Sequence, residues 1–376
     1  MATVTNPNTG DQASDEALDM PERKTDFRFR SLRSTYIKEW GVKSLLLVCA
    51  TLSIFTTFAI IAVLFTEATR FFQHDNVYCD AVIEEEKEDR VCGAFVGTST
   101  KDTAGLEQAC PDCGHMHTMP AEITLVDFIS GTKWNPLLGR ESEKEFGVWA
   151  LISATLIVSG IAMCLALPLG LITAIYLSEY ASPRVRAMIK PTLEVLAGIP
   201  TVVYGFFALT VITPTLQFFH GGFGTFNAMA GGIAVGILCL PIVSSLVEDA
   251  LQAVPRALRE GAYGLGATKF EVSTKVVVPA ALSGIISAFL LAVSRAVGET
   301  MIVALAVGSR PQLSLDPRND MQTMTGWMVQ MALGDVSNYD VEYLSMYAVA
   351  AVLFLITLAL TFTGNIVRNR FREEYQ

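Results

Sequence analysis

The sequence predicts an all-α membrane protein that crosses the bilayer several times, and two observations carry this prediction. Of its 376 residues, 51% are hydrophobic and only 17% are charged, and the mean hydropathy is +0.43. Water-soluble domains carry roughly a quarter charged residues. The apolar residues also gather in blocks long enough to cross a bilayer, which takes about 20 helical residues. A water-soluble globular protein is therefore excluded.

Six apolar blocks predict six transmembrane helices. They cover residues 44–65, 148–177, 195–219, 228–247, 276–309 and 347–367. The first block is longer than the about 7–15 apolar residues of a secretory signal and begins beyond residue 40, so we expect it to remain as an anchor. The spacing of apolar residues over 321–333 also predicts an amphipathic helix at the outer interface.

The blocks divide the chain into five parts. We expect a partly disordered tail over 1–43, the first helix over 44–65, a large extracytoplasmic insertion over 66–147, a core of five helices over 148–367 and a basic tail over 368–376. The insertion thus lies between the first and second helices.

Basic residues give the orientation, because cytoplasmic loops near the spans are enriched in Lys and Arg. Several precede the first block, and others follow the last: Arg23, Lys24, Arg28, Arg30, Arg33, Lys38 and Lys43, then Arg368, Arg370 and Arg372. This predicts a multi-pass protein of a prokaryotic plasma (inner) membrane with both termini in the cytoplasm. The net charge of −10 excludes nucleic acid as a partner, since binding phosphodiesters needs a basic face.

The predicted insertion contains four of the seven cysteines: Cys79, Cys92, Cys110 and Cys113. An even number of cysteines on the oxidising side favours two disulfides and no metal ion. Two alternatives stay open for the run from Cys110 to His117. Its thiols and imidazoles could bind zinc or copper, or the cysteines could exchange disulfides, although the strand–helix–strand pattern of a thioredoxin-like domain is missing.

The loop over 248–279, between the fourth and fifth blocks, predicts two short helices bent at a glycine. Either Gly264 or Gly266 can end the first helix in a left-handed turn. Thr268 and Glu271 have the spacing of a capping box, which would begin the second helix. A rigid bent element of this kind can transmit force if another protein grips it.

This loop resembles the EAA motif of importer-type ABC permeases, which places an inner-face helix in a groove of the ATP-hydrolysing subunit. The matching positions are Glu260, Gly261, Ala262, Gly266 and Pro279, with Gly261 where the motif usually has Ala. The resemblance implies that these residues couple the chain to an ATPase.

Over residues 146–367 the chain resembles phosphate ABC transporter permeases of the PstC type. The matching segments are residues 177–181, 196–207 and 295–301. It implies a type I ABC importer (MetI-like) permease fold and a transport subunit that is not an enzyme. It also implies three protein partners in the lipid bilayer or beside it: a PstA-like sister permease as heterodimer partner, a homodimeric ABC ATPase that uses ATP-Mg, and an extracytoplasmic phosphate-binding protein. It implies no cofactor on this chain.

The fifth apolar block contains two charged residues. Burying Arg295 in a bilayer costs about 2.5–3.5 kcal/mol, and Glu299, four positions on, is placed to form an ion pair with it on one helix face. If an oxyanion passes here, Arg295 can donate to it, Glu299 can accept from a protonated phosphate oxygen, and Thr300 can add a hydroxyl donor. Thr201, which follows a proline, is a further candidate for the path. The alternative is that the pair only locks the helix against its neighbours.

The leading interpretation is the permease subunit of an ATP-driven inorganic phosphate importer, which forms the translocation path with a sister permease. Molybdate and sulfate permeases share the EAA element, so another oxyanion stays open. An ion-coupled secondary transporter would also use a buried Arg–Glu pair, but the halves show no clear symmetry. The sequence has no G-x-x-x-x-G-K-[ST] motif, so we expect a separate chain to bind ATP. A third class, an external thiol or metal enzyme anchored by the spans, depends only on the Cys110–His117 run.

Overall fold

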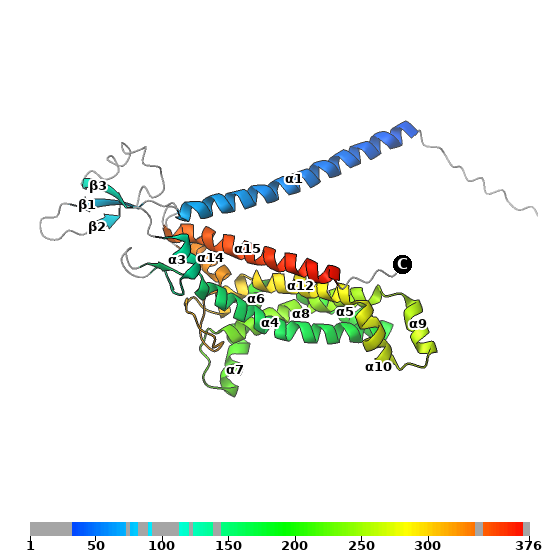
Figure 1. Ribbon diagram of the computed structural model, residues 1–376. Coiled ribbons are helices and arrows are strands. Elements are labelled where there is room, and N and C mark those ends of the chain that lie inside the picture. Colours follow the sequence, from blue (N-terminus) through cyan, green and yellow to red (C-terminus); the bar gives the residue numbers. More distant parts are fainter. Residues whose placement is uncertain are drawn as a thin grey trace, which may run out of the picture. The chain divides into compact units, whose positions relative to one another are not determined.

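Figure 1 shows the computed structural model of the chain, which describes residues 32–72, 76–81, 89–91, 113–119, 123–137, 144–334 and 341–370. The chain divides into two units, Met1–Ala59 and Ile60–Gln376, and each is described by itself.

The first unit contains most of helix α1 (Leu32–Phe72), up to Ala59. Large apolar side chains along it, such as Leu47, Phe55 and Phe58, are more than half exposed. A long helix that is apolar on every face is suited to a bilayer. The helix extends beyond the predicted block 44–65 at both ends.

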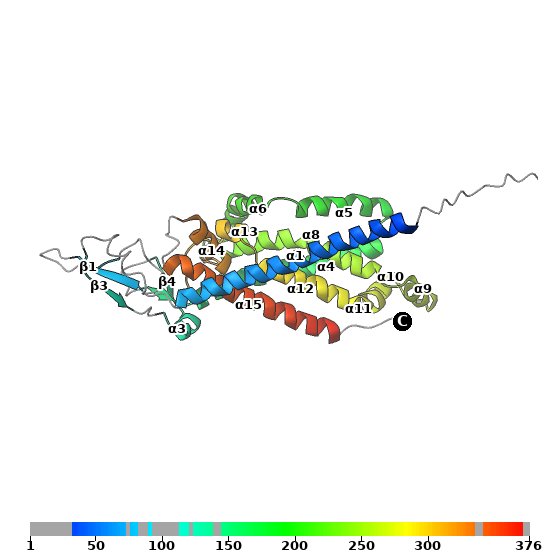
Figure 2. The same cartoon turned by 90° about the horizontal axis from the view of Figure 1, so that it is seen from above.

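The second unit is a bundle whose principal helices are α4 (Trp149–Ile175), α8 (Ala228–Gln252), α12 (Leu282–Val297) and α15 (Val341–Arg370). Helix α9 (Arg256–Gly264) lies at one end of this unit and α14 (Met324–Leu333) at the other (Figures 1 and 2), and we name the two ends after them. α4 and α8 both end at the α9 end, and α12 begins there.

Within the described ranges, five helices are long and apolar enough to cross a membrane: Glu39–Phe72, Trp149–Tyr180, Thr201–Phe219, Ala228–Gln252 and Val341–Arg370. A sixth crossing results if Lys269–Ala280 and Leu282–Val297, which meet at an angle of 71°, count as one span. The all-α polytopic class is confirmed, and the predicted number of six holds only with the bent pair included.

Small residues let α4 and α8 pack closely. A Cβ atom at Gly236 would lie 3.0 Å from the carbonyl oxygen of Ala162, and one at Gly170 would lie 2.6 Å from Cγ1 of Val243. Ala162 is fully buried. Close approach at glycine and alanine is typical of helices that associate in membranes. The core of the second unit therefore lies along the α4–α8 contact.

An aromatic cluster forms the core at the α14 end. Trp134 of β4 (Trp134–Asn135) pairs in register with Phe146 of β5 (Glu145–Phe146), and the two rings lie 5.7 Å apart. The Trp134 ring also lies 5.3 Å from that of Trp327 on α14. Phe71, near the end of α1, stacks on the same Phe146 at 5.3 Å, edge to face. The helix predicted over 321–333 is confirmed as α14, although it begins three residues later. It is not the predicted amphipathic helix at an interface, because its first four residues and Met331 are buried in the core.

The predicted insertion contains an antiparallel sheet in the order β2–β1–β3, made of β1 (Asn76–Ala81), β2 (Asp89–Val91) and β3 (Cys113–Met119). Cys79 lies in β1 opposite Met116, and Cys113 lies in β3 opposite Ala81. Cys92 and Cys110 lie outside the described residues. The disulfide, metal and thiol-exchange predictions therefore stay untested.

Two predicted spans are interrupted. The block 195–219 was wrong at its start, because Ala197 ends a separate helix, α5 (Pro183–Ala197), and the span begins at Thr201 with α6 (Thr201–Phe207). Pro200 explains the break, since proline lacks an N–H group and disfavours helix in the residue before it. This span continues through η3 (Ala208–Ile212) into α7 (Thr213–Phe219).

The block 276–309 is not one helix either. It turns by 71° between α11 (Val278–Ala280) and α12, and it breaks again between α12 and α13 (Met301–Ala306).

Candidate functional site

The predicted helix–turn–helix forms at the α9 end of the bundle. α9 ends at Gly264, and Gly266 has φ +84°, so Gly266 makes the left-handed turn that the sequence assigned to either glycine. Thr268 Oγ1 accepts a hydrogen bond from the Glu271 N–H group (3.4 Å), while Glu271 Oε2 accepts one from the Thr268 N–H group (3.1 Å). The predicted capping box is confirmed, and it begins α10 (Lys269–Glu271).

The residues of the EAA-like motif do not all face the same way. Glu260, Gly261 and Gly266 are exposed on α9 and its turn, whereas Ala262 is half-buried and packs against the core. Pro279 is exposed but lies further along the chain in α11, past η4 (Val272–Val277). The turn thus presents a surface, and a backbone bend separates it from α12.

Two large apolar side chains complete this surface. Leu265 is 92% exposed and Phe270 is 68% exposed, and both lie beside the turn at Gly266. Exposed apolar side chains gathered on a rigid turn are typical of a protein contact site.

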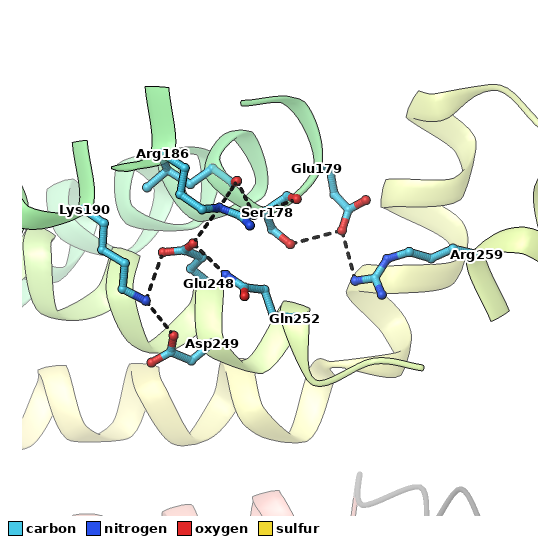
Figure 3. A network of polar contacts seen from close by, with 9 residues as sticks. Ser178, Glu179, Arg186, Lys190, Glu248, Asp249, Gln252 and Arg259 are labelled. Carbon is cyan, nitrogen blue, oxygen red and sulfur yellow. Dashed lines mark hydrogen bonds and ion pairs between the residues drawn. The ribbon is translucent and has the colours of Figure 1, made fainter. Parts of the chain in front are cut away.

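Behind this surface lies a charge network, which we define as Glu179, Arg186, Lys190, Glu248, Asp249 and Arg259 (Figure 3). Arg259 Nη2 of α9 donates to Oε1 of Glu179 (3.1 Å), which lies in η2 (Tyr176–Tyr180) directly after α4. The same guanidinium donates to the carbonyl oxygens of Leu251 (2.7 Å) and Val254 (2.6 Å), where α8 ends.

The other half of the charge network has its centre at Glu248 of α8, which is fully buried. Its Oε1 lies 3.1 Å from Nε of Arg186 on α5, and its Oε2 lies 3.6 Å from Nζ of Lys190. Arg186 also donates to the carbonyl oxygens of Leu177 (2.5 Å) and Ser178 (2.9 Å). Removing one partner of a buried ion pair costs about 3–5 kcal/mol, so these contacts strongly restrain the helix ends.

Lys190 completes the charge network. Its Nζ donates to Oδ1 of Asp249 (2.9 Å), and this hydrogen bond is the main reason why the pKa of Lys190 rises above its ordinary value. The negative charges of Glu248 and Asp249 act in the same direction, while partial burial opposes them. Lys190 therefore remains charged at physiological pH.

Sequence reasoning missed the charge network because its partners are far apart in the chain. Glu179 and Arg259 are separated by 80 positions. One sequence signal could have predicted the charge network. Glu179 and Glu248 each follow closely after an apolar block, and a carboxylate buried at the end of a helix bundle needs a cationic partner.

The predicted path residues lie at the break between α12 and α13. α12 ends at Val297 with Gly298 as its cap, and the Glu299 N–H group bonds to the carbonyl oxygen of Ala296 (3.4 Å) in a tighter turn. Arg295 is exposed and Glu299 is buried. The predicted ion pair between them was wrong: no such pair forms within 4 Å in the described residues, because Gly298 interrupts the helix that would align them.

The two threonines of the predicted path lie on neighbouring helices. Thr300 is half-buried and donates to the Gly298 carbonyl oxygen (3.2 Å), and Thr201 is half-buried at the beginning of α6. α6 and α13 pack where a Cβ atom at Gly205 would lie 2.8 Å from Cδ1 of Leu305.

Comparison with known proteins identifies the family to which this chain belongs. Residues 166–373 match the family described as "Binding-protein-dependent transport system inner membrane component". The chain belongs to this family. As a family member it is a multi-pass membrane permease component of an ABC transporter, and ATP hydrolysis belongs to a separate subunit.

Two of the three relatives compared with this chain are named as phosphate permeases. The chain is 33% identical over 255 residues to "Phosphate transport system permease protein PstC" of Mesorhizobium japonicum, covering 62% of this chain and 75% of the relative. It is 32% identical over 222 residues to "Phosphate transport system permease protein PstA 1" of Mycobacterium tuberculosis (59% and 70%). It is 32% identical over 235 residues to "Probable ABC transporter permease protein YqgH" of Bacillus subtilis (62% and 75%). The resemblance to phosphate permeases is confirmed.

Solved structures with a similar trace are more distant. An inward-facing MetNI methionine ABC transporter is 18% identical, with a TM-score of 0.46, and covers 60% of this chain and 95% of that one. A bacterial ABC transporter that imports alginate is 14% identical, with a TM-score of 0.49, and covers 72% and 89%.

Proposed function

We propose that this chain is the transmembrane permease subunit of an ATP-driven phosphate importer, with the α9 end in the cytoplasm. Arg295 carries the proposal, because it is an exposed guanidinium on an apolar helix. Facing lipid would be costly for this charge, so it must face a water-filled path or a partner.

The break at Gly298 supports a role for the neighbouring residues in the path. An arginine offers a planar set of N–H donors that matches a tetrahedral oxyanion, while Glu299 can accept from a protonated oxygen of phosphate. The guanidinium of Arg295 is exposed, so its contact with the ion can open again. The names of the relatives support phosphate as the ion.

We propose three protein partners. A PstA-like sister permease would cover the face that Arg295 leaves open and form the other half of the path. A homodimeric ATPase that uses ATP-Mg would hold α9 through the surface at Leu265 and Phe270. An extracytoplasmic phosphate-binding protein would deliver the ion at the α14 end, because the net charge of −10 does not attract free anions.

The test is uptake of radiolabelled phosphate into vesicles that contain this chain with its sister permease, ATPase and binding protein. We expect ATP-dependent uptake by the native chain. Arg295→Gln should reduce it by roughly tenfold or more, since a hydrogen bond to a charged group is worth about 1.5–3 kcal/mol. Arg370→Gln, which removes an exposed charge at the end of α15, is the matched control and should transport normally.

Three results would contradict the proposal. Full transport by Arg295→Gln would remove this residue from the path. Uptake of sulfate or molybdate in place of phosphate would change the ion. Uptake that continues without ATP, driven by an ion gradient, would place the chain in a different class of transporter.

A further inference from the structure

Two arginines at the α9 end make contacts of the same kind. Arg186 donates to two main-chain carbonyl oxygens of η2, directly after α4, and it pairs with Glu248 on α8. Arg259 donates to main-chain carbonyl oxygens at the end of α8, and it pairs with Glu179 on η2. Each arginine therefore holds the helix end that carries the other arginine's carboxylate. Figure 3 shows the two pairs, Arg186 with Glu248 and Arg259 with Glu179.

The arrangement connects four elements. The last carbonyl groups of a helix have no partner within the helix, and a guanidinium both satisfies them and matches the negative end of the helix dipole. Arg186 connects α5 to the ends of α4 and α8, and Arg259 connects α9 to the same two helix ends. The carboxylates are buried, with side-chain exposures of 7% for Glu179 and 0% for Glu248, so water competes weakly for these contacts.

The contacts of Arg259 restrain α9 in addition to its chain connection to α8. The chain between α8 and α9 is short, but it makes a turn at Pro255 and could act as a hinge. Arg259 crosses that turn, because it lies on α9 and bonds to carbonyl groups on the α8 side of the turn. Its bond to Glu179 then fixes α9 against a second helix.

We propose that Arg259 and Arg186 are positioning residues that make α9 and α5 move as one body with the α4–α8 pair. A displacement of α9 then reaches the whole helix pair instead of being absorbed at the turn. This inference rests on the proposed function, in which an ATPase moves α9.

The test measures distances within the complex purified with its ATPase. Spin labels are introduced through non-canonical amino acids at Ala257 on α9 and Met188 on α5, both of which are exposed. In the native chain we expect one narrow distance that is the same with and without ATP. Glu179→Gln and Arg259→Gln should give a broader distance that changes when ATP binds, while Arg184→Gln, an exposed charge on α5, should leave the native result.

A second measurement separates positioning from folding. The variants that break the contacts should still bind the ATPase and hydrolyse ATP, but import at least about fivefold less phosphate per ATP, the lower end of couplings between sites. Because Arg259→Gln already removes the contact with Glu179, the double variant Glu179→Gln/Arg259→Gln should lose no more than Arg259→Gln alone.

Two results would overturn the inference. One is a native distance that changes with ATP, and the other is a distance in the Gln variants that is as narrow and constant as in the native chain. Neither depends on which ion is carried. Absence of phosphate uptake by the native chain would contradict the proposed function alone, since the distances would still test the contacts.

Discussion

At the scale of single residues, the absence of a side chain sets how closely the two central helices approach. Gly236 faces the backbone of Ala162, and backbone cannot move aside as a flexible side chain can. Gly160, on α4, is exposed and has nothing within 4 Å of its Cβ position. The two glycines therefore differ in surroundings while sharing helical conformation.

We predict that Gly236→Val destabilises the protein and that Gly160→Val does not. Overpacking in a close contact costs about 1–3 kcal/mol, and the valine must push α4 away from α8. Thermal unfolding of the purified chain in detergent measures the difference. Equal losses in the two variants would mean that helix propensity, and not the close contact, is responsible.

A second residue-scale prediction concerns pH. In the loop between α13 and α14, hydrogen bonds from the Arg318 side chain and then from its N–H group lower the pKa of Asp316 to about 2. A carboxyl group with a lowered pKa stabilises the folded state above its ordinary pKa of about 3.9, and this stabilisation is lost as pH falls through about 2.

Asp316→Asn should therefore lower the thermal midpoint by a small amount that is constant from neutral pH to about pH 5, and that disappears toward pH 2. The effect is small because the pair is exposed to solvent. A difference that changes between neutral pH and about pH 5 would assign the effect to another group.

At the scale of elements, the turn after α9 depends on one backbone angle. Gly266 has φ +84°, which costs about 1–2 kcal/mol for a residue with a side chain. Gly264 has no positive φ and open space at its Cβ position. Of the two glycines, only Gly266 is required by the turn.

We predict that Gly266→Ala weakens the binding of the ATPase by roughly tenfold, because the strained turn moves Leu265 and Phe270. Gly264→Ala should bind normally. Copurification of the ATPase at increasing salt, followed by titration of the two proteins, measures the change. Normal binding by Gly266→Ala would show that the ATPase does not depend on this turn.

The elements also show where sequence reasoning succeeds. Caps and turns are local, so Thr268 and Glu271 were sufficient to predict the beginning of α10. Breaks inside apolar blocks are harder to predict, because hydropathy does not change at Gly298 or at the bend before α12. Pro200 does indicate a helix break, but the prediction of one span over 195–219 followed the length of the apolar block instead.

At the scale of the whole molecule, the aromatic cluster joins the end of α1, the β4–β5 hairpin and α14 within the second unit. Trp327 is fully buried, and its Nε1 donates to Oγ of Ser345 on α15 (3.1 Å). Trp149, at the start of α4, is 47% exposed and offers a control with the same side chain.

We predict that Trp327→Ala costs about 3–5 kcal/mol of unfolding free energy, whereas Trp149→Ala costs much less. Limited proteolysis should then cut the segment 123–137 more rapidly in Trp327→Ala than in the native chain. An unchanged rate would mean that the hairpin is held independently of α14.

Composition and hydropathy were enough to predict an all-α membrane protein, and the motifs were enough to predict the family. The charge network and the close α4–α8 contact were not predicted, because each depends on residues that only the folded chain brings together. An ion pair between Arg295 and Glu299 was predicted and does not form, since one glycine decides whether the two share a helix.

The corner of 71° before α12 has a mechanical consequence. A force applied to a straight helix displaces it along its own axis, whereas a force applied to the segment before a bend also rotates the helix that follows. We therefore expect a displacement of Lys269–Ala280 to move the guanidinium of Arg295, near the end of α12, laterally in the membrane plane. An ion bound to that group would then move across the translocation path and not along it.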